Sequence, residues 1–203
     1  AHEIKHQLND SGAKALVVLA NIAKNASTII AETSVEQVIV TELADVHPPL
    51  KRLLINTVVK YVKKLVPEFS FPSHIKLNDA LHMAKQPWHP VAINPEDVAV
   101  LQYTGGTTGV AKGAMLTHRN LVANMLQLNA HMVDSFRRNQ EIYIAPLPLY
   151  HIYSFTIHCT SAVALGNHSV LIPNPRDIPA FVATLKKYPF TLFVGLNTLF
   201  NAL

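Results

Sequence analysis

Short apolar runs alternate with stretches of helical periodicity along this chain. Residues 15–20, ALVVLA, contain no polar side chain, which is typical of a strand that is covered on both faces. Similar runs recur, and most are separated by segments in which apolar residues return every three or four positions. They occupy residues 38–40, 98–103, 142–145, 170–172 and 192–194. This alternation predicts an α/β fold of mostly parallel sheets flanked by helices.

Several helices are marked by their ends and by their apolar faces. The first is expected to end at Ser11-Gly12, because glycine readily terminates a helix. A second is predicted to begin near Thr117, and a third has Asp177 as its cap with Pro179 in its first turn. The apolar faces, which are predicted to cover a sheet, consist of Leu121, Met125, Leu128 and Met132 in the second helix and Phe181, Val182 and Leu185 in the third.

Residues 50–66 combine an apolar stripe with many cations. The stripe consists of Leu50, Leu54, Val58, Val62 and Leu65, and the cations are Lys51, Arg52, Lys60, Lys63 and Lys64. This pattern predicts a basic amphipathic helix that ends at Pro67. Such a helix is either an ordinary charged surface or a peripheral contact with anionic lipid. Residues 67–95 hold five prolines without a clear period, which predicts a long irregular connection.

The composition is that of a globular chain with a sizeable core. It has 203 residues, of which 49% are hydrophobic and 15% charged. The net charge of +4 is modest, and the Lys and Arg residues are not gathered into a tract interleaved with aromatic residues. Nucleic acid is therefore not an expected partner. Cys159 is the only cysteine, which excludes an internal disulfide and favours a reducing, cytoplasmic setting.

One uncharged stretch, residues 142–175, raises the question of a membrane span. Gly166, Asn167 and four prolines interrupt it, and the apolar helical part that begins at His151 has about 15 residues where a span needs about 20. A buried helix and strand are therefore expected here.

The chemistry of the chain is concentrated in residues 103–113, YTGGTTGVAKG, which follow a predicted strand and are called the phosphate loop below. Glycines allow main-chain N–H groups to approach an anion closely, threonines add hydroxyl donors, and Lys112 adds a positive charge. The residues that form this predicted polyphosphate cradle are Thr104, Gly105, Gly106, Thr107, Thr108, Gly109 and Lys112.

Two better-known phosphate motifs do not fit this segment. The Walker loop requires Lys directly after its last Gly, whereas two residues separate Gly109 from Lys112. It then requires Ser or Thr, and Gly113 follows instead. The GxGxxG spacing of the dinucleotide fingerprint is also absent. A Gly/Thr-rich turn without a ligand is the alternative, but glycines, hydroxyls and a lysine gathered after a strand argue against it.

The loop resembles the phosphate-loop signature of the acyl-adenylate-forming superfamily, which includes acyl-CoA synthetases, peptide-synthetase adenylation domains and luciferases. That signature has Ser or Gly, then Gly-Thr-Thr-Gly, with Pro before Lys; Ala111 stands here in place of the Pro. The resemblance extends over nearly the whole chain and is firmest from Asp97 onward. The segments most similar to bacterial long-chain fatty acid CoA ligases are AMLTHRNLVAN, PLPLYHIYS, NPRDIP and KYPFTLFVGLNTLFNAL.

This resemblance implies an enzyme that converts a long-chain fatty acid and ATP into acyl-AMP and then transfers the acyl group to coenzyme A. Residues 104–112 would hold the β- and γ-phosphates of ATP, with Lys112 stabilising the negative charge that develops during attack. Magnesium is expected to accompany ATP. Metal ligation by the protein is not expected.

A second group of candidate residues surrounds His151. The resemblance places Tyr150 and His151 beside the acyl carboxylate and the adenylate, where His151 would gate or orient the substrates. Phe155 lies four residues on and would share a helical face with His151, as a lining residue of the acyl pocket. Without the resemblance, a single histidine at the start of an apolar helix is more typical of packing. Cys159 has no adjacent base and is interpreted as a core residue rather than a nucleophile.

The predicted organisation is a fragment of the N-terminal AMP-binding domain of such an enzyme, covering residues 1–203. Residues 1–49 form a βα part, 50–95 the basic helix and irregular connection, and 96–203 the phosphate loop and further βα units. The small C-terminal domain is expected to be absent, and the 203 residues alone are expected to be inactive. The alternative function is a non-catalytic peripheral membrane or nucleotide-binding module, with residues 50–66 contacting the inner face of the membrane.

Overall fold

The computed structural model describes residues 1–83, 87, 89–105 and 110–203, which form two compact units. Unit 1 contains residues 1–92 and 103–114, and unit 2 contains residues 93–102 and 115–203. Each unit has a sheet of parallel strands and its own hydrophobic clusters. The predicted α/β class and the parallel pairing are thereby confirmed.

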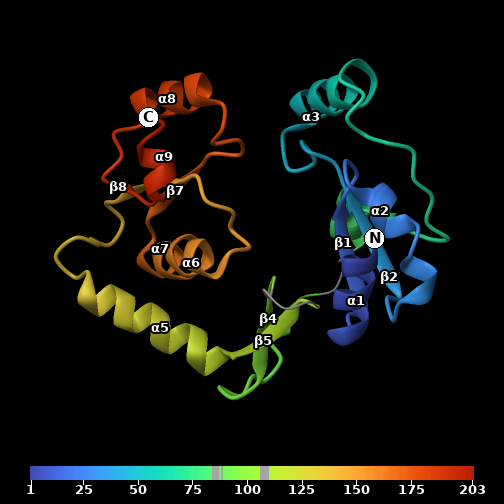
Figure 1. Cartoon of the computed structure of the whole chain (residues 1–203), viewed down its shortest axis with the longest axis horizontal. Coiled ribbons are helices and arrows are strands. Elements are labelled where there is room, and N and C mark those ends of the chain that lie inside the picture. The colour runs from blue at the N-terminus through green and yellow to red at the C-terminus, as the bar shows by residue number, and fades with distance from the viewer. Residues whose placement is uncertain (84–86, 88, 106–109) are drawn as a thin grey trace. The chain divides into compact units, whose positions relative to one another are not determined.

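The sheet of unit 1 has the strand order β1-β2-β3, and its strands β1 and β2 are labelled in Figure 1. Strand β1 (Ala15–Leu19) pairs over its whole length with β2 (Gln37–Thr41), and β2 pairs with the short strand β3 (Ile75–Lys76). The predicted strands at 15–20 and 38–40 are therefore present. The helical segments of this unit are α1 (His2–Asp10), α2 (Ala23–Ser27), η1 (Ile30–Glu32), α3 (Pro49–Thr57), the π-helical turn η2 (Val58–Val62) and α4 (Leu77–Met83).

Helix α1 ends where glycine was expected to end it. Gly12 has a φ of +63°, and the N–H of Ala13 donates to the carbonyl of Leu8 at 3.2 Å. This left-handed turn sends the chain directly into β1. Leu8 packs against the core cluster of unit 1, which consists of Val18, Ala20, Ala23, Ala26, Ile30, Val38, Val40 and Phe71.

The prediction of a purely irregular connection over residues 67–95 was wrong. This stretch contains β3 and α4, and β3 continues the parallel sheet beyond β2. A strand of two residues has too few positions to show an alternating pattern, and its pairing with β2 comes from tertiary contacts. Residues 84–86 and 88 lie outside the described residues.

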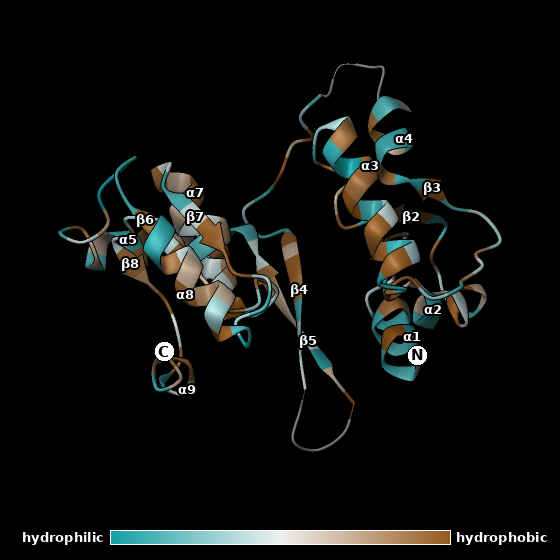
Figure 2. Cartoon of the chain, turned by 90° about the horizontal axis from the view of Figure 1, so that it is seen from above, coloured by the Kyte–Doolittle hydropathy of each residue, from teal (hydrophilic) through white to brown (hydrophobic). Residues whose placement is uncertain are grey.

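The basic amphipathic helix is present, but its apolar stripe is not buried. Helix α3 continues into η2, and Lys64 has a left-handed φ of 50° shortly before Pro67. Apolar and polar residues alternate visibly around α3 (Figure 2). Four of the five predicted stripe residues are exposed, with relative exposures of 82% for Leu50, 65% for Leu54, 69% for Val62 and 55% for Leu65.

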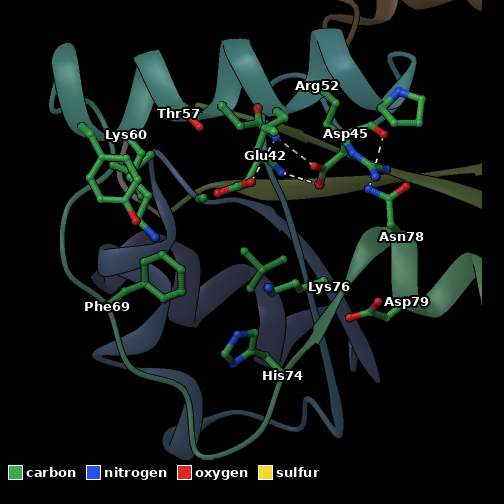
Figure 3. A pocket seen from close by; sticks show the side chains of 17 residues that line it. Glu42, Asp45, Arg52, Thr57, Lys60, Phe69, His74, Lys76, Asn78 and Asp79 are labelled. Carbon is green, nitrogen blue, oxygen red and sulfur yellow. Dashed lines mark hydrogen bonds between the residues drawn. The ribbon is translucent and has the colours of Figure 1, made fainter.

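A polar network fixes α3 at the carboxyl end of β2, beside a pocket of about 740 Å³ (Figure 3). Asn56 of α3 donates to Asp45 Oδ1 at 3.1 Å and to Glu42 Oε2 at 3.0 Å, and it accepts from the N–H of Ala44 at 3.0 Å. Asp45 also accepts from the N–H of Glu42 at 2.7 Å. The carboxylates of Glu42 and Asp45 therefore serve to attach the helix, and the pocket contains none of the predicted site residues.

The sheet of unit 2 has the order β7-β6-β8, and both pairings are parallel. Its strands β6 (Ile142–Ala145), β7 (His168–Leu171) and β8 (Leu192–Phe193) confirm the three predicted runs to within two residues. The helical segments of this unit are α5 (His118–His131), α6 (Ile152–Ser154), the π-helical turn η3 (Phe155–Ser161), α7 (Ala162–Leu165), α8 (Ile178–Lys187) and α9 (Asn197–Phe200).

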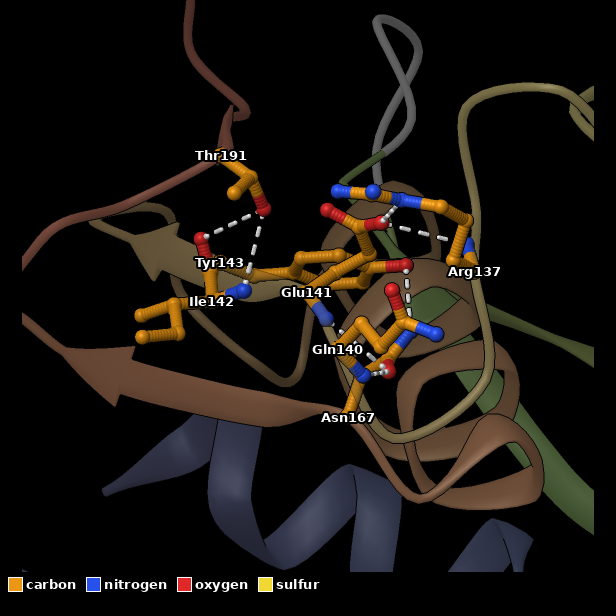
Figure 4. Close-up of polar contacts among 7 residues, drawn as sticks. All are labelled: Arg137, Gln140, Glu141, Ile142, Tyr143, Asn167 and Thr191. Carbon is orange, nitrogen blue, oxygen red and sulfur yellow. Dashed lines mark hydrogen bonds and ion pairs between the residues drawn. The ribbon is translucent and has the colours of Figure 1, made fainter.

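Polar side chains secure the beginning of β6 (Figure 4). Arg137 Nε donates to the buried carboxylate of Glu141 at 2.7 Å, and the N–H of Ile142 donates to Thr191 Oγ1 at 3.0 Å. Asn167 Nδ2 donates to the hydroxyl of Tyr143 at 3.1 Å. The hydrogen bond from Arg137 is the main reason why the pKa of Glu141 lies below its usual range.

The predicted helix start near Thr117 and the predicted cap Asp177 are both confirmed in unit 2. Thr117 forms a reciprocal capping box with Asn120 at the start of α5, and Asp177 accepts from the N–H of Ala180 at the start of α8. Phe181 of α8 packs against the sheet as predicted. Leu128 of α5 packs against a cluster that contains Tyr143 of β6, and α5 also contacts η3, which was not predicted. Across the described ranges, no helix is both long and apolar enough to cross a bilayer.

Candidate functional site

The phosphate loop connects two paired strands. Strand β4 (Val98–Thr104) ends at the loop and β5 (Lys112–Thr117) begins after it, and the two form a separate two-stranded sheet. The run at 98–103 is thus a strand as predicted, but it belongs to neither parallel sheet. Strand β5 was not predicted, because its sequence, KGAMLT, lacks both an apolar run and clear alternation.

The structure describes both stems of the loop but not its centre. Thr104 is the last residue of β4, Gly105 follows it, and Lys112 is the exposed first residue of β5. A Cβ atom built on Gly105 would meet no heavy atom within 4 Å, so the backbone there is open to approach. The remaining predicted loop residues, Gly106, Thr107, Thr108 and Gly109, lie outside the described residues.

Both stems contact helix α1. The hydroxyl of Tyr103 donates to Asp10 Oδ2 at 2.5 Å, and His6 Nε2 lies 3.0 Å from the carbonyl oxygen of Ala111. A carbonyl oxygen only accepts, so this hydrogen bond requires a proton on Nε2 of His6. The hydrogen bond to Asp10 is the main reason why the pKa of Tyr103 is raised, because a phenolate beside a carboxylate is disfavoured.

The ring of Tyr103 lies against the backbone of Gly113. A Cβ atom added to Gly113 would come within 2.9 Å of Tyr103 Cζ, which is closer than a side chain tolerates. Glycine at this position of β5 therefore leaves room for the ring that reaches Asp10.

Tyr150 and His151 lie at the start of a continuous helical run formed by α6, η3 and α7. His151 is the N-cap, and its Nδ1 accepts from the N–H of Tyr153 at 3.3 Å, which leaves Nε2 as the protonated nitrogen of a neutral ring. Tyr150 is 80% exposed, and its carbonyl accepts from Gln102 Nε2 of β4 at 2.8 Å.

Phe155 follows His151 by one helical turn. Its N–H donates to the carbonyl of His151 at 2.8 Å, so the two residues share a helical face as predicted. It is half-buried and begins the π-helical turn η3, a feature that is frequent at functional sites. His151 itself is exposed rather than packed in a core.

Comparison with known proteins gives the family. The family described as AMP-binding enzyme matches residues 1–203. This chain belongs to the AMP-binding enzyme family. Its predicted site residues fall in both compact units, with the described loop residues in unit 1 and Tyr150, His151 and Phe155 in unit 2.

Several relatives of this AMP-binding chain carry the name long-chain-fatty-acid–CoA ligase. The Escherichia coli O157:H7 protein is 49% identical over 202 residues, which cover 99% of this chain and 36% of that protein. The Haemophilus influenzae protein is 45% identical over 205 residues, with the same two coverages. The crystal structure of a long-chain-fatty-acid-CoA ligase from Archaeoglobus fulgidus has a TM-score of 0.65 at 28% identity and covers 99% of this chain and 34% of that one. The chain thus spans about a third of the length of these relatives.

Sequence reasoning predicted helix α1 but missed its contacts with the phosphate loop. His6 and Asp10 are four residues apart on α1 and roughly a hundred positions before their partners. Their spacing places both on one helical face, but many polar pairs have that spacing. Only the three-dimensional structure shows which pair lies beside the loop.

Cys159 is partly buried, and burial raises the pKa of its thiol. A raised thiol pKa disfavours the thiolate that a nucleophile needs. This agrees with the interpretation of Cys159 as a packing residue.

Proposed function

We propose that the protein to which this chain belongs activates a long-chain fatty acid with ATP and transfers the acyl group to coenzyme A. The observation that carries this proposal is the Gly/Thr/Lys loop between β4 and β5, in an AMP-binding chain 49% identical to a protein named long-chain-fatty-acid–CoA ligase. The names of the relatives supply the substrate class. They give no support to the alternative of a non-catalytic module.

The reaction has two steps. A carboxylate oxygen of the fatty acid attacks the α-phosphorus of ATP, and the bond from that phosphorus to the oxygen bridging the β-phosphate breaks. Pyrophosphate leaves with the bonding electrons, and acyl-AMP is formed. The thiolate of coenzyme A, after loss of its proton, then attacks the acyl carbon. AMP leaves with the electron pair of the bond between that carbon and the phosphate oxygen.

In this proposal the phosphate loop holds the β- and γ-phosphates. Hydroxyl and N–H donors from residues 104–109 and the charge of Lys112 offset the negative charge that accumulates as the carboxylate approaches. The chain's described residues include no group of three or more His, Cys, Asp or Glu side chains that could hold a metal ion. Magnesium is proposed to enter as part of the MgATP substrate, with phosphate oxygens among its ligands.

Tyr150, His151 and Phe155 are proposed to bind the acyl substrate. The exposed imidazole of His151 has its Nδ1 engaged by the N–H of Tyr153, which directs the donor Nε2 away from the helix toward a substrate oxygen. Phe155 presents an aromatic ring one turn further along the same face, which suits an alkyl chain.

The decisive experiment uses Lys112→Ala in a full-length enzyme that carries this sequence. Acyl-AMP formation, measured as palmitate-dependent pyrophosphate release, should fall at least about tenfold, because charge-assisted contacts to a developing anion contribute a few kcal/mol. Lys186→Ala, which removes an exposed lysine of α8, is the matched control and should retain activity. Pyrophosphate release at the wild-type rate in Lys112→Ala would remove this lysine from the mechanism.

We also propose that the enzyme is cytoplasmic and contacts anionic membrane lipid through α3 and η2. The specific observation is that exposed Leu50, Leu54 and Val62 stand among exposed lysines on one helical segment. Apolar side chains can enter the headgroup region while lysines remain at the anionic surface. Fatty acid substrates partition into membranes, which gives such a contact a use.

Vesicle sedimentation tests this contact. The full-length enzyme should bind vesicles that contain phosphatidylglycerol, and binding should weaken when salt is raised because surface charges are screened. Replacing Lys60, Lys63 and Lys64 by Gln should reduce binding, whereas replacing Lys186 and Lys187 should not. Equal binding to neutral and anionic vesicles, or none to either, would contradict the proposal.

A further inference from the structure

Both described stems of the phosphate loop contact one face of helix α1. Asp10 accepts from Tyr103 on the incoming stem, and His6 contacts the carbonyl of Ala111 on the outgoing stem. Because positions 6 and 10 lie one turn apart on α1, the two contacts come from the same side of the helix.

Helix α1 is itself fixed in place. Leu8 packs against the core cluster of unit 1, Lys5 forms an ion pair with Glu32, and Asn9 Nδ2 donates to the carbonyl of Glu32 at 3.0 Å. Contacts from α1 to the loop stems therefore connect them to a packed core.

We propose that His6 and Asp10 are positioning residues for ATP, which set the separation and orientation of the two stems of the phosphate loop. This inference rests on the proposed function of the loop. A phosphate-binding loop stabilises an anion only when its donors already point at the position that the anion takes, so the stems must be held before ATP arrives. Neither side chain needs to touch the nucleotide.

Gly113 supports this role independently. The Tyr103 ring occupies the space that a side chain at Gly113 would fill, and the same ring carries the hydroxyl that reaches Asp10. Residues on both strands thus cooperate in one contact with α1.

The experiment measures steady-state kinetics of a full-length enzyme that carries this sequence. Asp10→Ala and Tyr103→Phe should each raise KM for MgATP by roughly 2- to 10-fold, the effect of losing one hydrogen bond. The double variant should be no worse than either single variant, because both remove the same contact. KM for the fatty acid and KM for coenzyme A should stay within about twofold of the wild-type values, because the two stems are proposed to position only the phosphates of ATP.

Four further variants separate positioning from folding. Asp10→Asn keeps an oxygen that can accept from Tyr103 and should restore most of the affinity for MgATP. Glu3→Ala, on the same helix but outside the contacts to both stems, is the matched control. His6→Leu should raise KM for MgATP, and His6→Gln, which keeps a donor, should raise it less.

The outcomes distinguish the two proposals. If Lys112→Ala impairs pyrophosphate release while Asp10→Ala and Tyr103→Phe behave like Glu3→Ala, the phosphate loop keeps its role and the positioning role of α1 is refuted. Additive losses in the double variant, or equal increases in KM for all three substrates, would also refute it. If Lys112→Ala has no effect on pyrophosphate release, the proposed function of the loop itself is refuted.

Discussion

At the scale of single residues, burial controls the charge of His158. This side chain is 4% exposed and lies on η3, with its Nδ1 3.2 Å from Ser169 Oγ. Within the described ranges, its Nε2 has no hydrogen-bond partner. Burial lowers the pKa of His158, because an imidazolium in this position would lose its hydration without gaining a counter-charge.

Protein stability should therefore fall as the pH drops below about 6.5, the ordinary pKa of histidine. The unfolded chain then binds a proton that the folded chain excludes, and this favours unfolding. His158→Met removes the titrating group, so its free energy of unfolding should depend less on pH between 7 and 5. Urea unfolding at several pH values measures this slope. A His158→Met slope equal to wild type would contradict the argument.

Residue chemistry could be predicted from sequence where it is local. Thr104, Gly105 and Lys112 belong to one contiguous segment, so the type of site they could form was visible without a fold. His6 and Asp10 could not be identified in this way, because their significance depends on partners brought near by the packing of α1. Their polar character alone is also typical of a solvated helix face.

At the scale of elements, Gly166 ends the helical run with a left-handed turn. Its φ is +68°, and the N–H of Asn167 donates back to the carbonyl of Ala162 at 2.8 Å. A Cβ atom at Gly166 would also lie 2.0 Å from Asn139 Oδ1. Any other residue at this position would therefore face both an unfavourable backbone conformation and a steric clash.

A left-handed backbone alone costs a residue with a side chain about 1–2 kcal/mol. Gly166→Ala should destabilise the protein by more than that. Gly12→Ala is a matched control, because Gly12 has a φ of +63° but an added Cβ would meet nothing within 4 Å. Thermal unfolding of both variants should therefore show the larger decrease in Tm for Gly166→Ala. Equal decreases would mean that Asn139 moves aside without cost.

Element prediction succeeded where a signal was strong and local. The strand at 142–145, the helix start near Thr117 and the cap Asp177 were found because apolar runs and helix-end signals act within a few positions. Strands β3 and β5 were missed because their sequences show no clear alternating pattern. Pairing with a neighbouring strand holds them in the extended conformation. The stripe of residues 50–66 gave the helix correctly but not its environment, because amphipathicity does not say what covers the apolar face.

At the scale of the whole molecule, the fold class followed from the order of the elements, whereas the division into two units did not. Alternating strands and helices predict parallel sheets. The boundary passes through β4 and β5, so that Tyr103 and Gln102 belong to different units although they are neighbours in one strand. No local pattern of residues marks such a boundary.

The last prediction concerns catalysis by the 203 residues alone. They cover 36% of the length of the Escherichia coli relative. Adenylation requires the carboxylate, the α-phosphate and magnesium in one geometry, and positioning of that kind supplies about 7 to 11 kcal/mol. The candidate residues of this chain are proposed to bind only the β- and γ-phosphates and part of the acyl substrate, so we expect weak ATP binding at most and no acyl-CoA formation.

Purified chain, shown to be folded by circular dichroism, should be assayed for palmitate-dependent pyrophosphate release and for acyl-CoA formation. Isothermal titration with MgATP measures binding separately, which distinguishes a chain that binds without turnover from one that does not bind. A full-length enzyme carrying the same sequence is the positive control. Turnover by the 203 residues at about 1 per second or faster, the range usual for enzymes, would show that the groups needed for both steps lie within them.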